Sequence, residues 1–266
     1  MRDTWFITGV SSGFGRAMSE QVLASGGRVF GTVREASAIA DLQKRYPDRF
    51  RHAVVDMVDG DTLEGVVADA FEAFGRIDVV VNNAGYGLFG AAEALSDAQI
   101  RHQIDTNLVA PILITKAALP YLRAQGGGRI IAVSSYGGQA THPGASLYHA
   151  SKWGLEGFFD ALAQEVAAFD IGVTIVEPGG ARTGFRSAAG AGLPDDIADY
   201  AKSPAGMVRK VLENPGHEPA GDPDAMSAAI IASADQNPAP LRLVLGDDAR
   251  GFIEKALKAR LAALDA

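Results

Sequence analysis

Short apolar runs alternate with longer amphipathic stretches along most of this chain. The apolar runs predict strands at residues 4–8, 28–33, 51–55, 77–81, 129–134, 173–177 and 241–245. Several runs, such as Val79-Val80-Val81, are apolar at every position, which is typical of a parallel sheet buried on both faces. Between them, helical patterns are predicted at residues 15–25, 61–74, 97–124 and 148–169.

This alternation predicts an α/β fold, a doubly wound parallel sheet of about seven strands with helices on both faces. The 266 residues suffice for one large domain, and no repeat or linker divides them, so we expect a single domain over 1–266. The exception is the segment 183–224, which is rich in Gly, Pro, Ala and Asp and only weakly periodic. Long irregular inserts are usually functional or mobile, so we expect a substrate lid at about 183–224.

Charge and composition exclude several classes of function. The net charge is −8 and no cluster of Lys and Arg occurs, so neither nucleic acid nor an anionic membrane is an expected partner. The absence of cysteine excludes disulfides, thiolate nucleophiles and thiolate metal sites. The first predicted strand begins at Thr4 and leaves no room for a signal peptide, and the apolar run at 108–115 is too short to span a membrane. We therefore expect a cytoplasmic protein.

A glycine-rich turn follows the first predicted strand and opens the first predicted helix. Its sequence is Thr8-Gly-Val-Ser-Ser-Gly-Phe-Gly15. Glycines let the backbone approach a phosphate, and the helix N-terminus offers N–H groups and the positive end of its dipole. This position predicts a dinucleotide site formed by Gly9, Ser11, Ser12, Gly13, Phe14 and Gly15. A tight strand-to-helix turn without a ligand is the plain alternative.

The end of the second predicted strand bears on the choice of cofactor. Folds that bind NAD carry an acidic residue there, about 20 residues after the glycines, to hold the ribose 2′-OH. This chain has Val33-Arg34, with no acid before Glu35. A guanidinium attracts the 2′-phosphate that a carboxylate would repel, so Arg34 favours NADP over NAD. An arginine that is merely solvated on a loop is the alternative.

A tyrosine and a lysine in the second half indicate proton chemistry. Tyr148 and Lys152 are four positions apart and share one helix face. A free tyrosine has a pKa of about 10, and a nearby ammonium is expected to lower it toward neutral pH. Ser135 ends a predicted strand, where its hydroxyl can hold a substrate oxygen; Ser134 is a rival for this role. A stripe on a surface helix is the plain alternative for the Tyr and Lys pair.

Further motifs join these in a familiar order. Asp56, Asn82-Asn83-Ala84-Gly85, Asn107 and Pro178-Gly179 followed by Thr183 occur at typical separations. With them, the chain resembles the classical short-chain dehydrogenase/reductase family over residues 4 to about 183. The resemblance implies a Rossmann-like fold and hydride transfer between NADP(H) and a carbonyl or secondary alcohol. It also implies a catalytic set composed of Asn107, Ser135, Tyr148 and Lys152.

The resemblance assigns a role to each of these residues. Tyr148 is the acid/base, Lys152 also grips the nicotinamide ribose, Ser135 orients the substrate, and Asn107 completes a proton relay through water. For the cofactor, it assigns the adenine to Asp56, the adenosine ribose to Asn83, Ala84 and Gly85, and the carboxamide to Pro178, Gly179 and Thr183. The plain alternatives are a helix cap at Asp56, a strand terminus at Asn83 and an ordinary Pro-Gly turn.

Other expectations concern metals, assembly and substrate. His142 and His149 have no spaced partners that suggest a metal site, so we interpret both as structural or pocket-lining. The resemblance implies a homodimer or homotetramer formed through the helices at 97–124 and 148–169. Apolar bulk for that contact is expected from Phe158, Phe159 and Leu162, which could equally face the core.

The substrate is expected to be a small carbonyl or alcohol compound. An apolar lining is suggested by Phe185, Leu193, Ile197, Tyr200 and Met207. Two other functions stay open. One is an NAD-dependent sugar or steroid dehydrogenase of the same family. The other is a non-catalytic dinucleotide-sensing regulator, which would be expected to have lost the tyrosine or the lysine.

Overall fold

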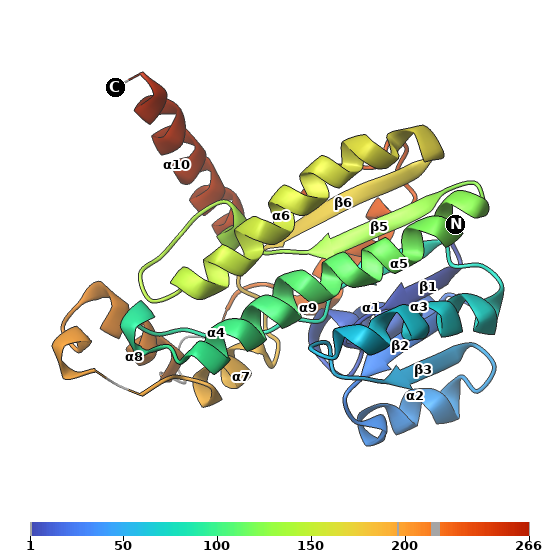
Figure 1. Ribbon diagram of the computed structural model, residues 1–266, viewed down its shortest axis with the longest axis horizontal. Coiled ribbons are helices and arrows are strands. Elements are labelled where there is room, and N and C mark those ends of the chain that lie inside the picture. Colours follow the sequence, from blue (N-terminus) through green and yellow to red (C-terminus); the bar gives the residue numbers. More distant parts are fainter. Residues whose placement is uncertain (1, 196, 214–218, 266) are drawn as a thin grey trace.

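Seven parallel strands form one sheet in this computed structural model, which describes residues 2–195, 197–213 and 219–265. Their order in the sheet is β3-β2-β1-β4-β5-β6-β7. The order confirms the predicted doubly wound fold, and each strand lies within two residues of the bounds expected from the sequence (Figure 1). The strands are β1 Thr4–Ile7, β2 Arg28–Val33, β3 Phe50–Val54, β4 Val79–Asn82, β5 Gly128–Val133, β6 Ile171–Pro178 and β7 Arg242–Leu245.

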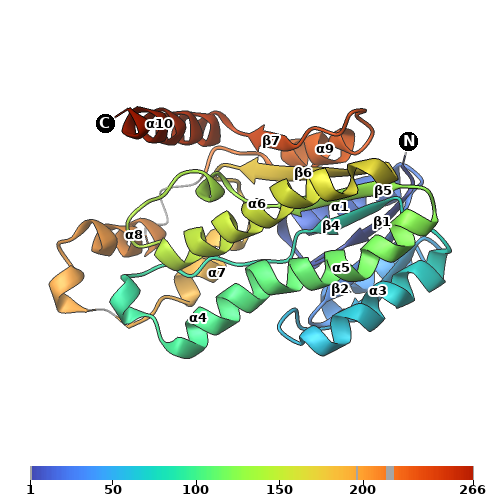
Figure 2. The ribbon, with the colours of Figure 1, turned by 45° about the horizontal axis from the view of Figure 1, so that its top comes forward.

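Helices cover both faces of the sheet (Figures 1 and 2). Neighbouring strand residues alternate between the two layers: Phe6 and Val80 belong to one apolar cluster, whereas Ile7 and Val81 belong to the other. This alternation explains why the central strands β1, β4 and β5 are buried at every position. The first layer is covered by α3 Gly60–Phe74, α5 Ala110–Ala124 and α6 Ser146–Val166, and the second by α1 Gly13–Ala24, α2 Ala40–Arg45 and α9 Pro223–Ser233.

The predicted helix at 97–124 is divided into three parts. It begins as α4 Asp97–Ile104, where Ser96 and Gln99 form a capping box, and it ends as α5. Between them, Asp105–Val109 winds as a π-helix that contains Asn107. π-turns within α-helices are rare, and those that occur often lie at functional sites. The predicted span of the helix is therefore confirmed. The expectation of one regular α-helix is wrong, because the helix changes to a π-turn at Asn107, the residue expected to act in catalysis.

The predicted insert at 183–224 holds short helices beside the carboxyl end of the sheet. They are α7 Phe185–Ala191 and α8 Pro204–Glu213, which pack on each other. Figure 1 shows this part in orange, set apart from the sheet. Residues 196 and 214–218 of the insert lie outside the described residues. Its role as a lid stays a prediction.

The apolar residues expected to mediate self-association lie inside the molecule. Phe159 is 0% exposed and Leu162 is 3% exposed. Both side chains belong to the apolar cluster between α6 and the sheet, and Phe158 packs against the same cluster. Phe159 and Leu162 therefore face the core, the alternative named from the sequence, and cannot supply an intermolecular contact; for half-buried Phe158 the expectation stays a prediction. Tyr121 on α5 and Trp153 on α6 are exposed instead.

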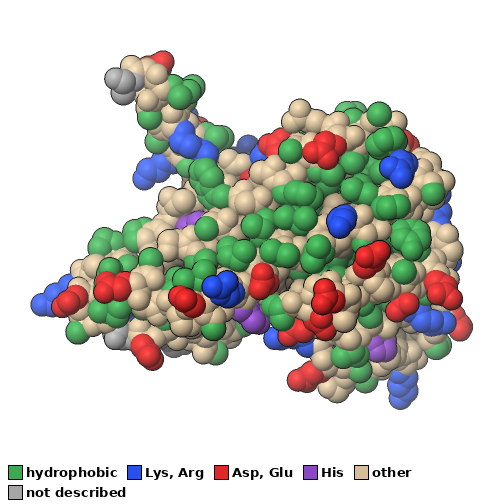
Figure 3. Space-filling model, viewed as in Figure 1, with side chains coloured by type: hydrophobic (Ala, Val, Ile, Leu, Met, Phe, Trp, Pro, Cys, Tyr) green, Lys and Arg blue, Asp and Glu red, His purple; other side chains and the backbone are tan. Residues whose placement is uncertain are grey.

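The last helix, α10 Asp247–Leu264, follows β7 and projects from the body of the molecule (Figures 1 and 2). Near its start, Phe252 stacks on Tyr136 with ring centroids 5.1 Å apart. Farther out, Leu257, Leu261 and Leu264 are exposed, and Figure 3 shows apolar side chains on this projecting helix. Among the described residues, no helix combines the length and apolarity needed to cross a bilayer.

Candidate active site

The glycine-rich turn lies where the strand order reverses, between β1 and β4. Gly9 and Gly13 have φ of 71° and 57°, in the left-handed region that favours glycine. A Cβ on Gly15 would lie 2.2 Å from the Gly9 carbonyl oxygen. The three glycines are thus required by this tight turn, and helix α1 begins directly at it. Ser11 and Ser12 are exposed there, whereas Phe14 packs against the core.

Asn83 braces this turn from the neighbouring strand. Its side-chain amide donates to the carbonyls of Thr8 and Gly9 at 2.8 and 3.1 Å. The Thr8 hydroxyl in turn accepts from the backbone N–H groups of Asn83 and Ala84, both at 2.9 Å. Asn83 therefore fills the structural role that the sequence left open, and it places Ala84 and Gly85 beside the turn.

A hollow of about 320 Å³ lies at the ends of β2 and β3. The structure brings Arg34 and Asp56 together in its lining. Arg34 is exposed and makes no hydrogen bond or ion pair with the described residues. The Asp56 carboxylate accepts from the Val58 N–H at 3.2 Å, and the cap position of α3 is Asp59 rather than Asp56. The hollow is lined by Arg34, Val54, Val55, Asp56, Asp59, Thr62 and Val66.

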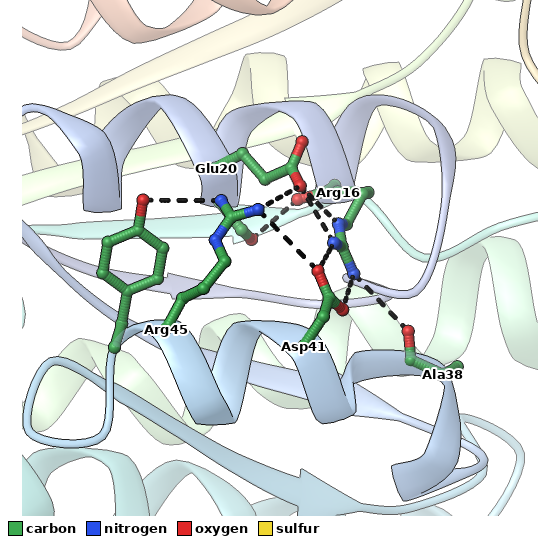
Figure 4. Close-up of polar contacts among 8 residues, drawn as sticks. Arg16, Glu20, Ala38, Asp41 and Arg45 are labelled. Atoms are coloured by element: carbon green, nitrogen blue, oxygen red, sulfur yellow. Dashed lines mark hydrogen bonds and ion pairs between the residues drawn. The ribbon is translucent and has the colours of Figure 1, made fainter.

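Arg16 is a second arginine near this end of the site, and the sequence reasoning did not single it out. It donates to Glu20 at 3.0 Å and to Asp41 at 3.0 Å (Figure 4). Hydrogen bonding to Arg16 is the largest cause that lowers the pKa of the Asp41 carboxyl. Because Asp41 lies on α2, Arg16 ties α1 to the segment that follows Arg34. Its guanidinium is already occupied, whereas that of Arg34 is available to a ligand.

Ser135, Tyr148 and Lys152 are buried together at the carboxyl edge of β5. Their exposed fractions are 7%, 8% and 5%. The Ser135 hydroxyl accepts from the Gly137 N–H at 3.0 Å, and Lys152 Nζ donates to the Val133 carbonyl at 2.8 Å. Tyr148 lies in the first turn of α6 and Lys152 one turn later, so the helix presents both side chains to the same edge.

Burial dominates the electrostatics of this pair. It raises the pKa of Tyr148 to about 12, while the Ser135 hydroxyl acts in the opposite direction. Burial also lowers the pKa of Lys152 to about 8, and the Glu156 carboxylate opposes that change. The expectation that the ammonium lowers the pKa of Tyr148 is wrong for this structure. Loss of water disfavours the phenolate more strongly than any nearby charge favours it.

Asn107 is held by the backbone of a neighbouring loop. Its side-chain amide donates to the Tyr86 carbonyl at 2.8 Å and to the Ser151 hydroxyl at 3.1 Å, and its carbonyl accepts from the Tyr86 N–H at 3.1 Å. A Cβ on Gly85 would lie 3.1 Å from Asn107 Oδ1 and 3.7 Å from Lys152 Nζ. The missing side chain of Gly85 thus leaves room for both Asn107 and Lys152.

The segment after β6, which was expected to contact the carboxamide of the cofactor, lies next to the glycine-rich turn. The Gly179 N–H donates to the Leu245 carbonyl at 2.8 Å, and the chain then turns back toward β1. A Cβ on Gly13 would lie 3.8 Å from the Thr183 side chain. Pro178, Gly179 and Thr183 therefore lie on a segment that runs from β6 to the glycine-rich turn.

Two phenylalanines pack against Tyr148. The ring centroid of Tyr148 lies 5.4 Å from that of Phe89 and 5.8 Å from that of Phe185. Phe185 was expected to line the pocket, but no motif pointed to Phe89, because it lies on a loop without periodicity. Of the other residues expected in the lining, Ile197 and Tyr200 border a separate small hollow, and Met207 is 53% exposed.

The two histidines near the site have structural partners. The His149 ring contacts the Gly137 carbonyl through Nδ1 at 2.8 Å and accepts from the His142 N–H through Nε2 at 3.0 Å. His142 Nε2 lies 2.5 Å from the Tyr136 hydroxyl. Within the described part of the chain, no group of His, Cys, Asp and Glu could hold a metal ion.

Comparisons with known proteins agree with this geometry. The family model of short chain dehydrogenases matches residues 3–193. A crystal structure of a short-chain dehydrogenase from Streptomyces avermitilis is 38% identical, with a TM-score of 0.89 over 99% of this chain and 95% of that chain.

Two curated relatives are reductases. The 3-ketodihydrosphingosine reductase of Bacteroides thetaiotaomicron is 34% identical over 90% of this chain and 86% of its own. The NADPH-dependent 3-dehydrocapnine reductase of Ornithobacterium rhinotracheale is 32% identical over 78% and 76%. With the fold, the glycine-rich turn and the Ser-Tyr-Lys set in place, the chain belongs to the short-chain dehydrogenase family and is an oxidoreductase.

Proposed function

We propose that this protein is an NADP(H)-dependent reductase that converts a ketone with an apolar substituent into a secondary alcohol. One observation carries the proposal: Tyr148 and Ser135 are buried side by side, with Phe89 and Phe185 against the Tyr148 ring, at the edge of the sheet that also bears the glycine-rich turn. A hydroxyl donor pair, an apolar cover and a phosphate-binding turn suit a carbonyl carbon that receives a hydride.

The contacts suggest a separate role for each of the four proposed catalytic residues. Tyr148 holds the proton that the substrate oxygen receives, and its raised pKa keeps it protonated at neutral pH, as reduction requires. Ser135 orients that oxygen as charge develops on it. Lys152 and Asn107 lie on the proton's route from solvent. When bound, the nicotinamide ring supplies the hydride.

The preference for NADP rests on the contrast between two arginines. Arg16 is paired with Glu20 and Asp41, whereas Arg34 faces the hollow at the ends of β2 and β3 without a partner among the described residues. A free guanidinium is a strong recognition group for a 2′-phosphate. Val54 and Val55 add apolar walls to the same hollow, which suit the flat face of an adenine. One relative is NADPH-dependent by name, which supports this choice.

The substrate class rests on the aromatic cover. Besides His149, whose ring lies 6.0 Å from that of Tyr148, the rings of Phe89 and Phe185 contact Tyr148, so a neutral group with apolar surface is the best match. The two reductases among the relatives act, by their names, on keto and dehydro compounds. We expect reduction rather than oxidation to be the cellular direction. We also propose a cytoplasmic homo-oligomer, with Tyr121 and Trp153 as exposed contacts.

One kinetic comparison tests the proposal. Ketones of graded size and polarity are offered with NADPH and with NADH, and consumption of the reduced nicotinamide is followed by absorbance. Turnover of apolar ketones with a preference for NADPH is the expected result. A preference for NADH would support the alternative of an NAD-dependent sugar or steroid dehydrogenase. Cofactor binding without turnover of any compound would support a dinucleotide-sensing regulator, although Tyr148 and Lys152 are both retained.

A further inference from the structure

A buried ionic cluster lies directly behind the catalytic side chains. Arg242 from β7 donates to Glu156 of α6 at 2.5 Å, to Glu177 of β6 at 2.6 Å and to Asp160 of α6 at 2.8 Å. Glu156 and Glu177 are 3% and 1% exposed, whereas the Asp160 side chain is 42% exposed. Two buried carboxylates therefore share one half-buried guanidinium, and an ion pair of this kind is weak evidence for a contribution to stability.

Glu156 also reaches the catalytic segment on both sides of Ser135. The Ser134 hydroxyl donates to Glu156 Oε1 at 2.7 Å, and the Gln139 side-chain amide donates to Oε2 at 2.6 Å. Ser134 immediately precedes Ser135, and Gln139 follows the turn that Ser135 caps. One carboxylate on the catalytic helix thus fixes both ends of the short segment that carries the catalytic serine.

The backbone is shaped to admit this carboxylate. A Cβ on Gly138 would lie 1.9 Å from Glu156 Oε1 and 2.4 Å from its Cδ. Any other residue at this position would expel the carboxylate, since no flexible end can move away in a buried site. Gly138 has an ordinary negative φ, so its lack of a side chain is needed for this close approach and not for a strained backbone.

Glu156 is also the charged neighbour of Lys152. The two residues are one helical turn apart, and the ammonium is buried with the Val133 carbonyl as its hydrogen-bond partner. The other ionisable groups around the pair are Tyr148 on α6, Glu177 on β6, Arg242 on β7 and Asp160 on α6. Among all these groups and Glu156 itself, it is Glu156 that raises the pKa of Lys152 against the effect of burial.

We propose that Glu156 is a positioning residue of the catalytic site, which fixes the Ser135 segment against α6 and keeps Lys152 in its charged form. The ionic cluster with Arg242 then holds Glu156 in place from the last strand. The kinetic part of this inference rests on the proposed reductase function, but the electrostatic part does not.

The electrostatic part is tested without cofactor or substrate. The pKa of Lys152 is measured by NMR titration of ε-¹³C-lysine in the free protein, with Lys152→Ala to assign the signal. Glu156→Gln keeps the shape and removes the charge, so the pKa of Lys152 is expected to fall by about one unit. Asp160→Asn is the matched control: it removes a carboxylate that also bonds Arg242 but does not touch Ser134, Gln139 or Lys152, and it should leave this pKa unchanged. An equal effect of both variants, or none in Glu156→Gln, overturns the charge effect.

The positioning part is tested by kinetics on the same variants. Glu156→Gln is expected to lower kcat about tenfold, to move the loss of activity at high pH to lower pH, and to leave the dissociation constant of NADPH nearly unchanged. Ser134→Ala removes only the bond to Oε1 and should lower kcat severalfold without moving the pH profile. If Glu156→Gln fails to fold, the kcat of Ser134→Ala alone tests the positioning role. Normal kcat in Ser134→Ala or in a folded Glu156→Gln overturns the positioning role, whereas wild-type protein without turnover refutes the reductase function and leaves the lysine titration valid.

Discussion

Lys152 Nζ donates a hydrogen bond to the carbonyl of Val133 at 2.8 Å, and this contact joins helix α6 to strand β5 two residues before Ser135. The ammonium therefore has a structural task as well as a chemical one. It is held at the sheet edge while burial lowers its pKa to about 8, so its charge is partly lost just above neutral pH. Both the hydrogen bond and the charge belong to the ammonium, so a substitution that removes it removes both.

Lys152→Met keeps the aliphatic stem and removes the ammonium, whereas Lys152→Ala removes both. We expect each to lower kcat at least about a hundredfold, because the proton route to Tyr148 loses its charged member. Both should also weaken binding of NADPH, measured by fluorescence titration. If either variant bound NADPH normally and kept its pH–rate profile, Lys152 would be merely a helix-to-strand contact.

Tyr148→Phe removes the hydroxyl and keeps the ring between Phe89 and Phe185. The expected result is a loss of at least about a hundredfold in kcat, because no other side chain of the site supplies the proton. Affinity for NADPH and the melting temperature should hardly change. Tyr136→Phe is the matched control, since that hydroxyl contacts His142 and not the reactive set. Comparable loss in the two variants would remove Tyr148 from its acid/base role.

Arg34→Ala should weaken NADP binding roughly ten- to a hundredfold, because one charge-assisted contact is worth about 1.5–3 kcal/mol. NAD binding should be nearly unaffected, since NAD lacks the 2′-phosphate. Arg45→Ala on α2 is a control that removes an equal charge away from the hollow. The measurement is kcat/KM with both cofactors, and a wild-type preference for NAD would refute the assignment.

A cofactor preference reversed toward NAD is expected from a carboxylate at position 34 and not from one at position 33. Val33 is 3% exposed and packs in the core, so an acid there would be buried without a partner. Arg34→Asp places the charge at the exposed end of β2, where it repels the phosphate and can accept from ribose hydroxyls. Its kcat/KM ratio for NAD over NADP should exceed that of Arg34→Ala; an equal ratio would exclude a direct contact with the ribose.

The fold was predictable because its strands and its glycine-rich turn depend on local sequence. Apolar runs such as Val79-Val80-Val81 indicate buried strands wherever they occur, and the turn around Gly9 and Gly13 needs its glycines for steric reasons. The tetrad of Asn107, Ser135, Tyr148 and Lys152 was recognised by order and spacing. Whether these residues act as proposed is a matter for the variants above.

What the sequence did not show depends on contacts between distant positions. Arg242 and Glu156 are 86 residues apart, and nothing in either segment signals the other. The π-turn at Asn107 leaves the apolar pattern of its helix intact, so periodicity could not detect it. The raised pKa of Tyr148 is a consequence of burial, and burial of a single side chain follows from packing that the spacing of motifs does not specify.

Phe185→Ala opens the cover over Tyr148. For ketones with a bulky apolar substituent, we expect KM to rise about tenfold, because a partly buried phenylalanine contributes about 1–2 kcal/mol of apolar contact. Small ketones that do not reach the ring should show little change. Met207→Ala on α8 is a suitable control, since this apolar side chain is 53% exposed. An increase in KM that is independent of substrate size would contradict a direct contact.

Glu177 should make the stability of the protein depend on pH near neutrality. Burial is the main cause, followed by the charge of Glu156, of a rise in its pKa from 4.5 to about 7, while Arg242 acts in the opposite direction. A carboxyl whose pKa is raised on folding holds its proton more tightly in the folded state. The stability that comes from this proton is fully present below pH 4.5 and is lost as the pH rises through about 7.

Glu177→Gln imitates the protonated carboxyl at every pH and still offers an acceptor to Arg242. The melting temperature of this variant relative to wild type should therefore increase between pH 5 and pH 8.5, as the wild-type carboxyl ionises among buried neighbours. Asp160→Asn is the control within the same cluster, because its exposed carboxylate should give no such trend. Thermal denaturation of all three proteins across this range makes the comparison. A constant difference between Glu177→Gln and wild type would show that Glu177 is already ionised at pH 5 and that Arg242 outweighs both its burial and the charge of Glu156.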